Sequence, residues 1–227
     1  NLAIGTEALN ATINGGEYNV AVGNFALDAL TTADSNTAVG YEAGSGVTTG
    51  GFNVFVGDIS GKGTTEGTSN VAVGRNSLVT NTTGSRNVAL GQNAVEYPDT
   101  ENDNLGIGYN ALSGTIAGGQ ANVAVGNYTL DALTSGDDNV AVGYNAGTGI
   151  TTGQRNIIIG EGCATALTTG QGNVVIGRLA AEAMDTGNDN TLIGRDAGSS
   201  YVGSGDDCTI VGKGSRPHSS ADNESNT

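Results

Sequence analysis

The feature that most constrains the fold of this 227-residue chain is a five-residue signature that recurs every 17 or 18 residues. NVAVG stands at residues 19–23, 122–126 and 139–143, and near-copies such as NTAVG, NVALG and NIIIG fill the intervals. Each copy ends with Gly, four residues after its first residue. Cys208 begins the last copy, and the others begin with Asn1, Asn19, Asn36, Asn53, Asn70, Asn87, Asn104, Asn122, Asn139, Asn156, Asn173 and Asn190. So short a period is typical of a solenoid, in which repeats bury their apolar side chains by stacking on one another.

A second, longer period divides the chain into two blocks. Residues 19–52 resemble residues 122–155 over most of their length, at an offset of six repeats. We therefore expect about 13 coils of 17–18 residues. The expected parts are a repeat region, 1–212, with six-coil blocks at 1–103 and 104–207 and the start of a terminal coil, followed by a polar tail or incomplete coil, 213–227.

The pattern inside one repeat predicts the shape of one coil. We number the positions of each coil from the signature Asn, which is position 0; positions −1 and −2 precede it. Positions 1 to 4 read apolar, small, apolar, Gly, which is the two-residue alternation of a strand. Position 7 is always small, and Gly is common at position 14 after Thr-Thr, as at Gly153. A strand, a corner, a second extended stretch and a Gly turn predict an all-β, parallel β-solenoid in which the stacked asparagines form a ladder of side-chain amides.

The side-chain sizes at positions 2 and 8 vary inversely, which predicts that the two side chains share one space. Where position 8 is large, as at Leu27, position 2 is Ala or Gly; where position 2 is large, as at Phe55, position 8 is small. The coils that begin at Asn36 and Asn139 are small at both positions. Tyr41 and Tyr144 are the candidates to fold over the resulting gaps.

The apolar residues of each strand form two sets that face opposite sides, and only one set can line the interior of the coil. The other set needs a cover, because a continuous exposed apolar stripe is an association site. Further copies of the same chain are the simplest cover. We favour a parallel homotrimer, and a dimer or a wider monomeric coil remains open.

The charge of the chain excludes several partners. There are 23 acidic and 8 basic residues, so the net charge is −15. Such a chain is repelled by nucleic-acid phosphates and by anionic lipid surfaces, and no apolar run is long enough for a membrane span. Two cysteines are too few for a disulfide framework.

The residues that carry most enzyme chemistry have no convergent partners in this sequence. His218 is the only histidine and lies in a polar segment, while Cys163 and Cys208 occupy positions of small or polar residues. We therefore expect no enzyme, no catalytic residue, no metal site and no cofactor. One alternative is calcium, which prefers oxygen ligands, at an acidic coil corner. Its carboxylates would come from Asp34, Asp103, Asp137, Asp138, Asp189, Asp206 and Asp207.

Several of the few aromatic residues follow the signature Gly. They are Tyr41, Tyr109 and Tyr144 at position 5 and Phe25 and Tyr128 at position 6. Two interpretations are open: the rings cap the coil corners, or they stack on the sugar rings of a glycan. The sequence identifies no receptor-binding residue.

The repeats resemble those of a known group of fibrous proteins. NTAVGYEAGSGVTTG and NVAVGNYTLDALTSGDD look like the NTAVGYxAL…TTG repeats of phage tail fibres and related bacterial surface proteins, and are similar to the NSVAIG head repeats of trimeric autotransporter adhesins. The resemblance implies a trimeric fibrous β-solenoid used for attachment. We expect the rigid shaft of a tail fibre in a virion, or alternatively a bacterial adhesin at the cell surface, with a surface glycan or protein as receptor.

A more distant alternative is an ice-binding solenoid. It rests on a column of Thr at position 12, interrupted by Asp99, Ile116 and Asp185. The column consists of Thr31, Thr48, Thr65, Thr82, Thr134, Thr151 and Thr168.

Overall fold

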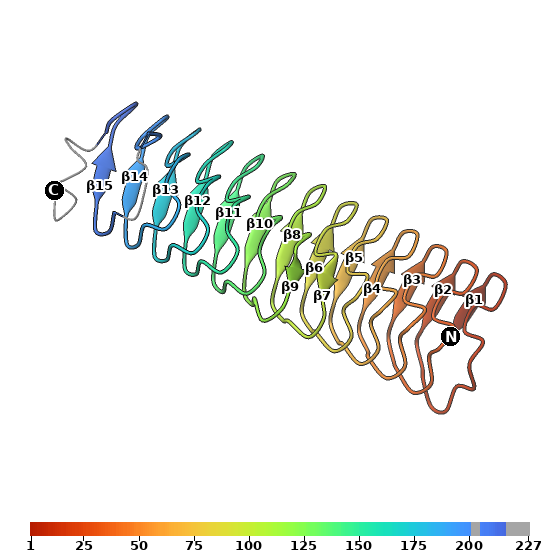
Figure 1. Ribbon diagram of the computed structural model, residues 1–227. Coiled ribbons are helices and arrows are strands. Elements are labelled where there is room, and N and C mark those ends of the chain that lie inside the picture. Colours follow the sequence, from red (N-terminus) through yellow and green to blue (C-terminus); the bar gives the residue numbers. More distant parts are fainter. Residues whose placement is uncertain (201–204, 217–227) are drawn as a thin grey trace. The chain divides into compact units, whose positions relative to one another are not determined.

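The computed structural model describes residues 1–200 and 205–216, and these are all-β, without a helix. The chain divides into two compact units, Asn1–Ala117 and Gly118–Thr227. Each unit is a parallel β-solenoid in which every signature supplies one three-residue strand (Figure 1). The predicted solenoid class is therefore confirmed. Residues 217–227 of the expected polar tail lie outside the described residues.

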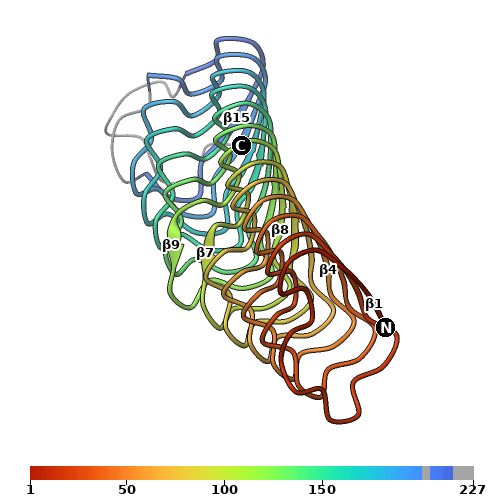
Figure 2. The same cartoon turned by 90° about the vertical axis from the view of Figure 1, so that its right-hand side faces the viewer.

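The first unit stacks its strands in sequence order. Each strand pairs in parallel with the strand one repeat later, as Val20 does with Thr37. The strands of this sheet are β1 (Leu2–Ile4), β2 (Val20–Val22), β3 (Thr37–Val39), β4 (Val54–Val56), β5 (Val71–Val73), β6 (Val88–Leu90) and β8 (Leu105–Ile107). A separate short pair, β7 (Tyr97–Pro98) and β9 (Thr115–Ile116), lies on another side of the coils (Figure 2).

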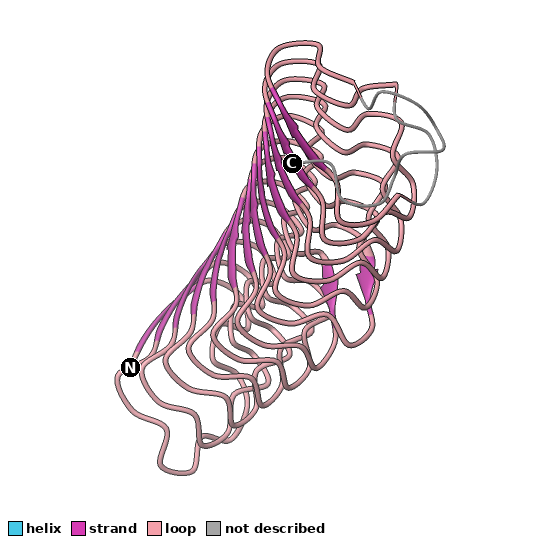
Figure 3. Ribbon diagram, turned by 90° about the vertical axis from the view of Figure 1, so that its left-hand side faces the viewer, coloured by secondary structure: helices cyan, strands magenta, loops and turns pink. Residues whose placement is uncertain are grey.

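The second unit repeats this plan. Its strands also pair in parallel with a shift of one repeat, as Val140 does with Ile157. They are β10 (Val123–Val125), β11 (Val140–Val142), β12 (Ile157–Ile159), β13 (Val174–Ile176), β14 (Thr191–Ile193) and β15 (Thr209–Val211). In each unit the signature strands lie along one side of the coils, and loops form the remainder apart from β7 and β9 (Figure 3).

The strands point position 2 inward and positions 1 and 3 outward. In β12, Ile158 is fully buried, whereas Ile157 and Ile159 remain 40% and 38% exposed. The signature asparagines share the inward side, and all those after Asn1 are buried. The interior of each coil is thus lined by position 2 and by the Asn ladder, while a β-branched face looks outward.

The closing Gly of the signature is required by both backbone and space. Gly57 has a φ of 137°, a conformation that residues with a Cβ rarely adopt. A Cβ built on Gly57 would lie 2.6 Å from the carbonyl oxygen of Gly74 in the next coil. The signature Gly thus permits adjacent coils to approach at the end of the strand.

Positions 2 and 8 do share one space, as predicted. A Cβ on Gly61 would overlap the Phe55 ring, and one on Gly198 would overlap Leu192. The same relation holds between neighbouring coils, because a Cβ on Gly106 would lie 2.6 Å from Val95.

The expectation that Tyr41 and Tyr144 fold over the gaps in their coils is wrong. The space beside Gly44 is filled from the neighbouring coils, by Leu27 and Phe55. Leu130 and Ile150 fill the equivalent space beside Gly147. The two tyrosines are instead exposed on the outside of their coils. Side chains of neighbouring coils therefore fill these gaps, together with Ile150 of the same coil at Gly147, because the coils stack within side-chain reach.

A further buried column lies at position 11, which the sequence analysis did not identify. Its apolar members include Leu30, Val47, Leu133, Ile150, Leu167 and Met184, all fully buried. This column packs beneath the second stretch of the coil. Only β7 and β9 form a strand pair there among the described residues. Elsewhere in this stretch, backbone N–H groups of one coil converge on one carbonyl oxygen of the next coil, as those of Thr31 and Thr32 do on Thr48 O at 3.0 and 3.3 Å.

Candidate functional site

The outward face of each sheet exposes a row of apolar side chains. Its side chains come from positions 1 and 3 of successive strands. Those that are most exposed in the second unit are Ile157, Ile159, Ile193 and Val211, and those in the first unit are Leu2, Ile4, Val39, Val54 and Val73. We call this the sheet face. Parallel sheets are normally covered on both sides, so an open sheet face is unusual.

Two aromatic side chains stand next to the sheet face of the first unit. Tyr18 and Phe52 occupy position −1 of coils two repeats apart, and they are 76% and 65% exposed. Both have left-handed backbones, with φ values of 60° and 63°. A large ring held out to solvent in this conformation is uncommon and adds to the apolar character of this side.

The predicted Asn ladder runs through the buried interior. Asn156 donates its backbone N–H and its Nδ2 to Oδ1 of Asn139, at 3.1 and 3.0 Å. Its Nδ2 also donates to the carbonyl oxygen of Gly170 in the turn of its own coil, at 2.9 Å. Each amide therefore connects two coils and closes one turn. Cys208 continues the ladder only through its backbone N–H, which donates to Asn190 Oδ1.

A hollow of about 290 Å³ lies on the turn that follows the strand in the first unit. We call it the aromatic hollow. The ring of Phe25 contacts that of Tyr41 edge to face, with centroids 6.0 Å apart. The residues that line the hollow are Phe25, Asp28, Glu42, Ser45, Gly46 and Lys62, from three successive coils.

The charged groups of the aromatic hollow are coupled. Lys62 Nζ lies 2.5 Å from Glu42 Oε2. Hydrogen bonds from Lys62 and from the Tyr41 hydroxyl lower the pKa of Glu42, and the same ion pair raises the pKa of Lys62. Partial burial, together with the nearby carboxylates of Glu42 and Glu7, raises the pKa of Asp28.

The second unit carries the same aromatic pair with different polar neighbours. Tyr128 and Tyr144 contact edge to face at 6.1 Å, at the positions of Phe25 and Tyr41. Asp131 stands at the position of Asp28, and burial raises the pKa of its carboxyl as well. The positions of Glu42 and Lys62, however, are taken by Asn145 and Thr165, so this corner lacks the ion pair.

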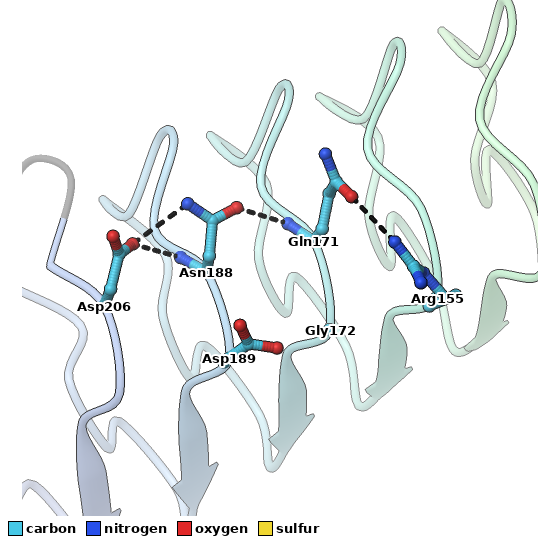
Figure 4. Close-up of a pocket in the computed structure, with 6 residues that line it drawn as sticks. All are labelled: Arg155, Gln171, Gly172, Asn188, Asp189 and Asp206. Atoms are coloured by element: carbon cyan, nitrogen blue, oxygen red, sulfur yellow. Dashed lines mark hydrogen bonds between the residues drawn. The ribbon is translucent and has the colours of Figure 1, made fainter.

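A second hollow, of about 560 Å³, lies at an acidic corner of the second unit (Figure 4). A chain of polar side chains crosses it from coil to coil. Asp206 Oδ1 accepts the backbone N–H of Asn188 at 2.7 Å, Asn188 Oδ1 accepts that of Gln171 at 3.0 Å, and Gln171 Oε1 accepts from Arg155 at 3.0 Å. The side chains of position −2 therefore hold adjacent coils together.

The carboxylates considered as calcium ligands take the same structural role. Asp34 and Asp137 each accept the backbone N–H of position −2 in the preceding coil, at 2.7 and 2.8 Å. Asp103 pairs with Arg86 through two hydrogen bonds. Within residues 1–200 and 205–216, no group of three or more His, Cys, Asp or Glu side chains is placed to hold a metal ion. Calcium stays an alternative to the expected absence of a metal, and a Ca²⁺ titration of the melting temperature tests it.

The other residues considered for chemistry lie as follows. Cys163 is fully buried, and burial raises the pKa of its thiol to about 12. Burial also raises the pKa of Cys208. His218 lies outside the described residues.

The threonines at position 12 donate their hydroxyls to backbone carbonyls of the next coil, as Thr48 does to Thr65 at 3.1 Å. The column of Thr therefore has a structural role, since it links adjacent coils.

Comparison with protein-family models, with curated proteins and with solved structures found no match to this chain. In the part of the chain that the structure describes, no helix is long and apolar enough to cross a membrane.

Proposed function

We propose that this chain is a non-catalytic, rigid segment of an attachment fibre, and that its copies associate through the sheet face. The observation that carries this proposal is the mainly β-branched, apolar face left open on parallel sheets. In the second unit, the outward side chains, which are Val or Ile except at Thr191 and Thr209, expose a mainly apolar stripe on the order of several hundred Å², near the upper end for monomeric proteins. A second copy would remove this stripe from water.

The number of copies rests on the sequence resemblance. The tail-fibre and autotransporter repeats that this sequence resembles imply a trimer, in which three sheet faces meet around one axis. We therefore propose a parallel homotrimer with the loops of each coil facing outward. The Asn ladder and the position-2 and position-8 side chains suit such a segment, since they fix every coil to the next.

We place the fibre on a phage or phage-derived virion, where it contributes to attachment to a host surface. A bacterial surface adhesin of the same build is the alternative, because both settings require a stiff, exposed spacer. The receptor would be a glycan or a protein of the contacted cell. The genes that flank this one in its genome distinguish the two settings.

The proposal is tested by the mass in solution, measured by light scattering on a size-exclusion column. One chain has a mass of 22.4 kDa, so a trimer has three times that mass, 67.2 kDa. We expect the Ile157→Glu/Ile159→Glu variant to elute as a monomer, because it places charges on the sheet face. Thr169→Glu, an exposed position away from this face, is the matched control and should keep the trimer. A monomeric parent chain would overturn the proposal.

A further inference from the structure

We propose that the aromatic hollow of the first unit binds an uncharged saccharide. The inference rests on the proposed attachment function for its biological setting, but the site is complete within one chain and does not require the trimer. The hollow spans three coils: the first contributes the Phe25 ring and the Asp28 carboxylate, the second the Glu42 carboxylate, and the third the Lys62 ammonium.

The aromatic part supplies a stacking surface. Phe25 lines the hollow, and its contact with Tyr41 is close to perpendicular, at 87°. This contact holds the Phe25 ring in place without covering both of its faces with another ring. The faces of an aromatic ring are electron-rich and attract the partly positive C–H groups on the apolar side of a pyranose.

The polar part supplies donors and acceptors of the kind that adjacent sugar hydroxyls need. A hydroxyl both donates and accepts, and a carboxylate beside an ammonium offers one partner for each role. Lys62 and Glu42 form such a pair at the hollow, while Asp28 and the Ser45 hydroxyl lie at the same site. Lys62 is 47% exposed in its side chain and Glu42 21%, so the pair remains within reach of a ligand.

The charge of the site selects against acidic sugars. Asp28 and Glu42 outnumber Lys62, and Glu7 adds a further negative charge close to Asp28. A sialic acid or uronic acid would bring its carboxylate toward this excess, which is unfavourable. The site therefore fits a neutral hexose or an N-acetylhexosamine.

The second unit provides a natural comparison. It has the aromatic pair Tyr128 and Tyr144 and also Asp131, but Asn145 and Thr165 replace the ion pair. The double substitution Glu42→Asn/Lys62→Thr thus installs residues that the same coil positions already accommodate. Glu42 and Asn145 even have similar backbones, with φ values of 50° and 54°, so this variant is expected to fold.

The experiment uses the full chain and immobilised oligosaccharides that end in glucose, galactose, mannose or N-acetylglucosamine, with sialylated oligosaccharides for comparison. We expect at least one neutral probe to bind with a dissociation constant in the millimolar range or below. Glu42→Asn/Lys62→Thr should weaken binding tenfold or more, with an unchanged melting temperature. Tyr144→Ala, at the corner without the ion pair, should bind like the parent chain.

Three results would overturn the inference: no neutral probe binds, the double variant binds as well as the parent chain, or the sialylated probes bind better. Failure of the proposed fibre is a separate result, because it is read from the mass in solution. A monomeric chain that binds a neutral glycan would overturn the proposed trimer and support the saccharide site. A trimeric chain that binds no glycan would support the trimer and overturn the saccharide site.

Discussion

At the scale of single residues, the side-chain amide of the signature asparagine joins one coil to the next. Asn139 Oδ1 accepts two hydrogen bonds from Asn156, and its Nδ2 donates to Gly153 O at 2.8 Å and to Asn122 Oδ1 at 3.1 Å. The side chain is fully buried. Its amide therefore satisfies groups that water cannot reach, and a buried group without a partner is costly.

Asn139→Asp is the sharpest test of this ladder. The variant keeps the shape and the acceptor Oδ1, but it turns the donor that faces Gly153 O into a second oxygen. Because burial and this carbonyl disfavour the carboxylate, the folded-state pKa of the introduced carboxyl should rise above its unfolded value of about 3.9. The protonated carboxyl has one O–H for the two N–H donors of Asn139, so the variant should be least destabilised near pH 3, and it should lose about 3–5 kcal/mol more as the pH rises to 7.

Urea unfolding at several pH values measures this dependence, with the parent chain compared at each pH. Asn145→Asp is the control, because it adds the same charge at a half-buried position outside the ladder. Equal losses for the two variants at pH 7 would contradict the argument from the ladder.

The sequence predicted the strand and the Asn ladder because both depend on a fixed residue type at a fixed position. It did not predict the left-handed backbones that turn each coil. Phe25, Leu27 and Ser35, at positions 6, 8 and −1, have φ values of 60°, 49° and 60°. These residues carry no local preference for that conformation, so packing between coils imposes it.

At the scale of the coil, one large side chain can serve two neighbouring coils. The Phe55 ring occupies the space of position 8 in its own coil, at Gly61, and also in the preceding coil, at Gly44. The sequence revealed this relation because the volumes at two positions vary inversely. It concealed the column at position 11, where Thr64 and Asn81 interrupt the apolar residues and remain buried.

Phe55→Ala and Gly61→Leu together test the shared space. Phe55→Ala leaves a cavity and should cost about 3–5 kcal/mol of the free energy of unfolding. Gly61→Leu alone should also destabilise, since its Cβ would meet the Phe55 ring. The double variant recreates the Ala72 and Leu78 arrangement of the next coil.

We therefore expect the double variant to be more stable than either single variant, with a coupling energy of about 2 kcal/mol or more in a double-mutant cycle. Chemical denaturation of the four proteins gives this value. Additive losses would mean that the two positions do not share a space.

At the scale of the whole molecule, the two units share the Asn ladder of the interior and differ at particular buried and surface positions. Both contain the Asn ladder and an outward sheet face, and both carry an aromatic pair. Exposed Tyr18 and Phe52, and the Glu42–Lys62 ion pair, belong to the first unit alone, where the equivalent residues of the second unit differ. A repeat dictates what is common to all coils, so it predicts the fold well. Individual sites arise where one repeat differs in sequence from the others, and the repeat pattern does not indicate which ligand such a site binds.

The net charge gives the last prediction, which concerns assembly. Each chain carries −15, so association through the sheet face brings negative charges together. Salt screens this repulsion, with a Debye length of about 8 Å at 0.15 M, and leaves apolar burial largely intact. If the proposed trimer forms, it should therefore dissociate at a higher protein concentration in about 10 mM NaCl than in about 150 mM. Sedimentation velocity at the two salt concentrations measures the difference, with Ile157→Glu/Ile159→Glu as the monomeric reference. Tighter association at low salt would show that ion pairs between copies, rather than the sheet face, hold the assembly.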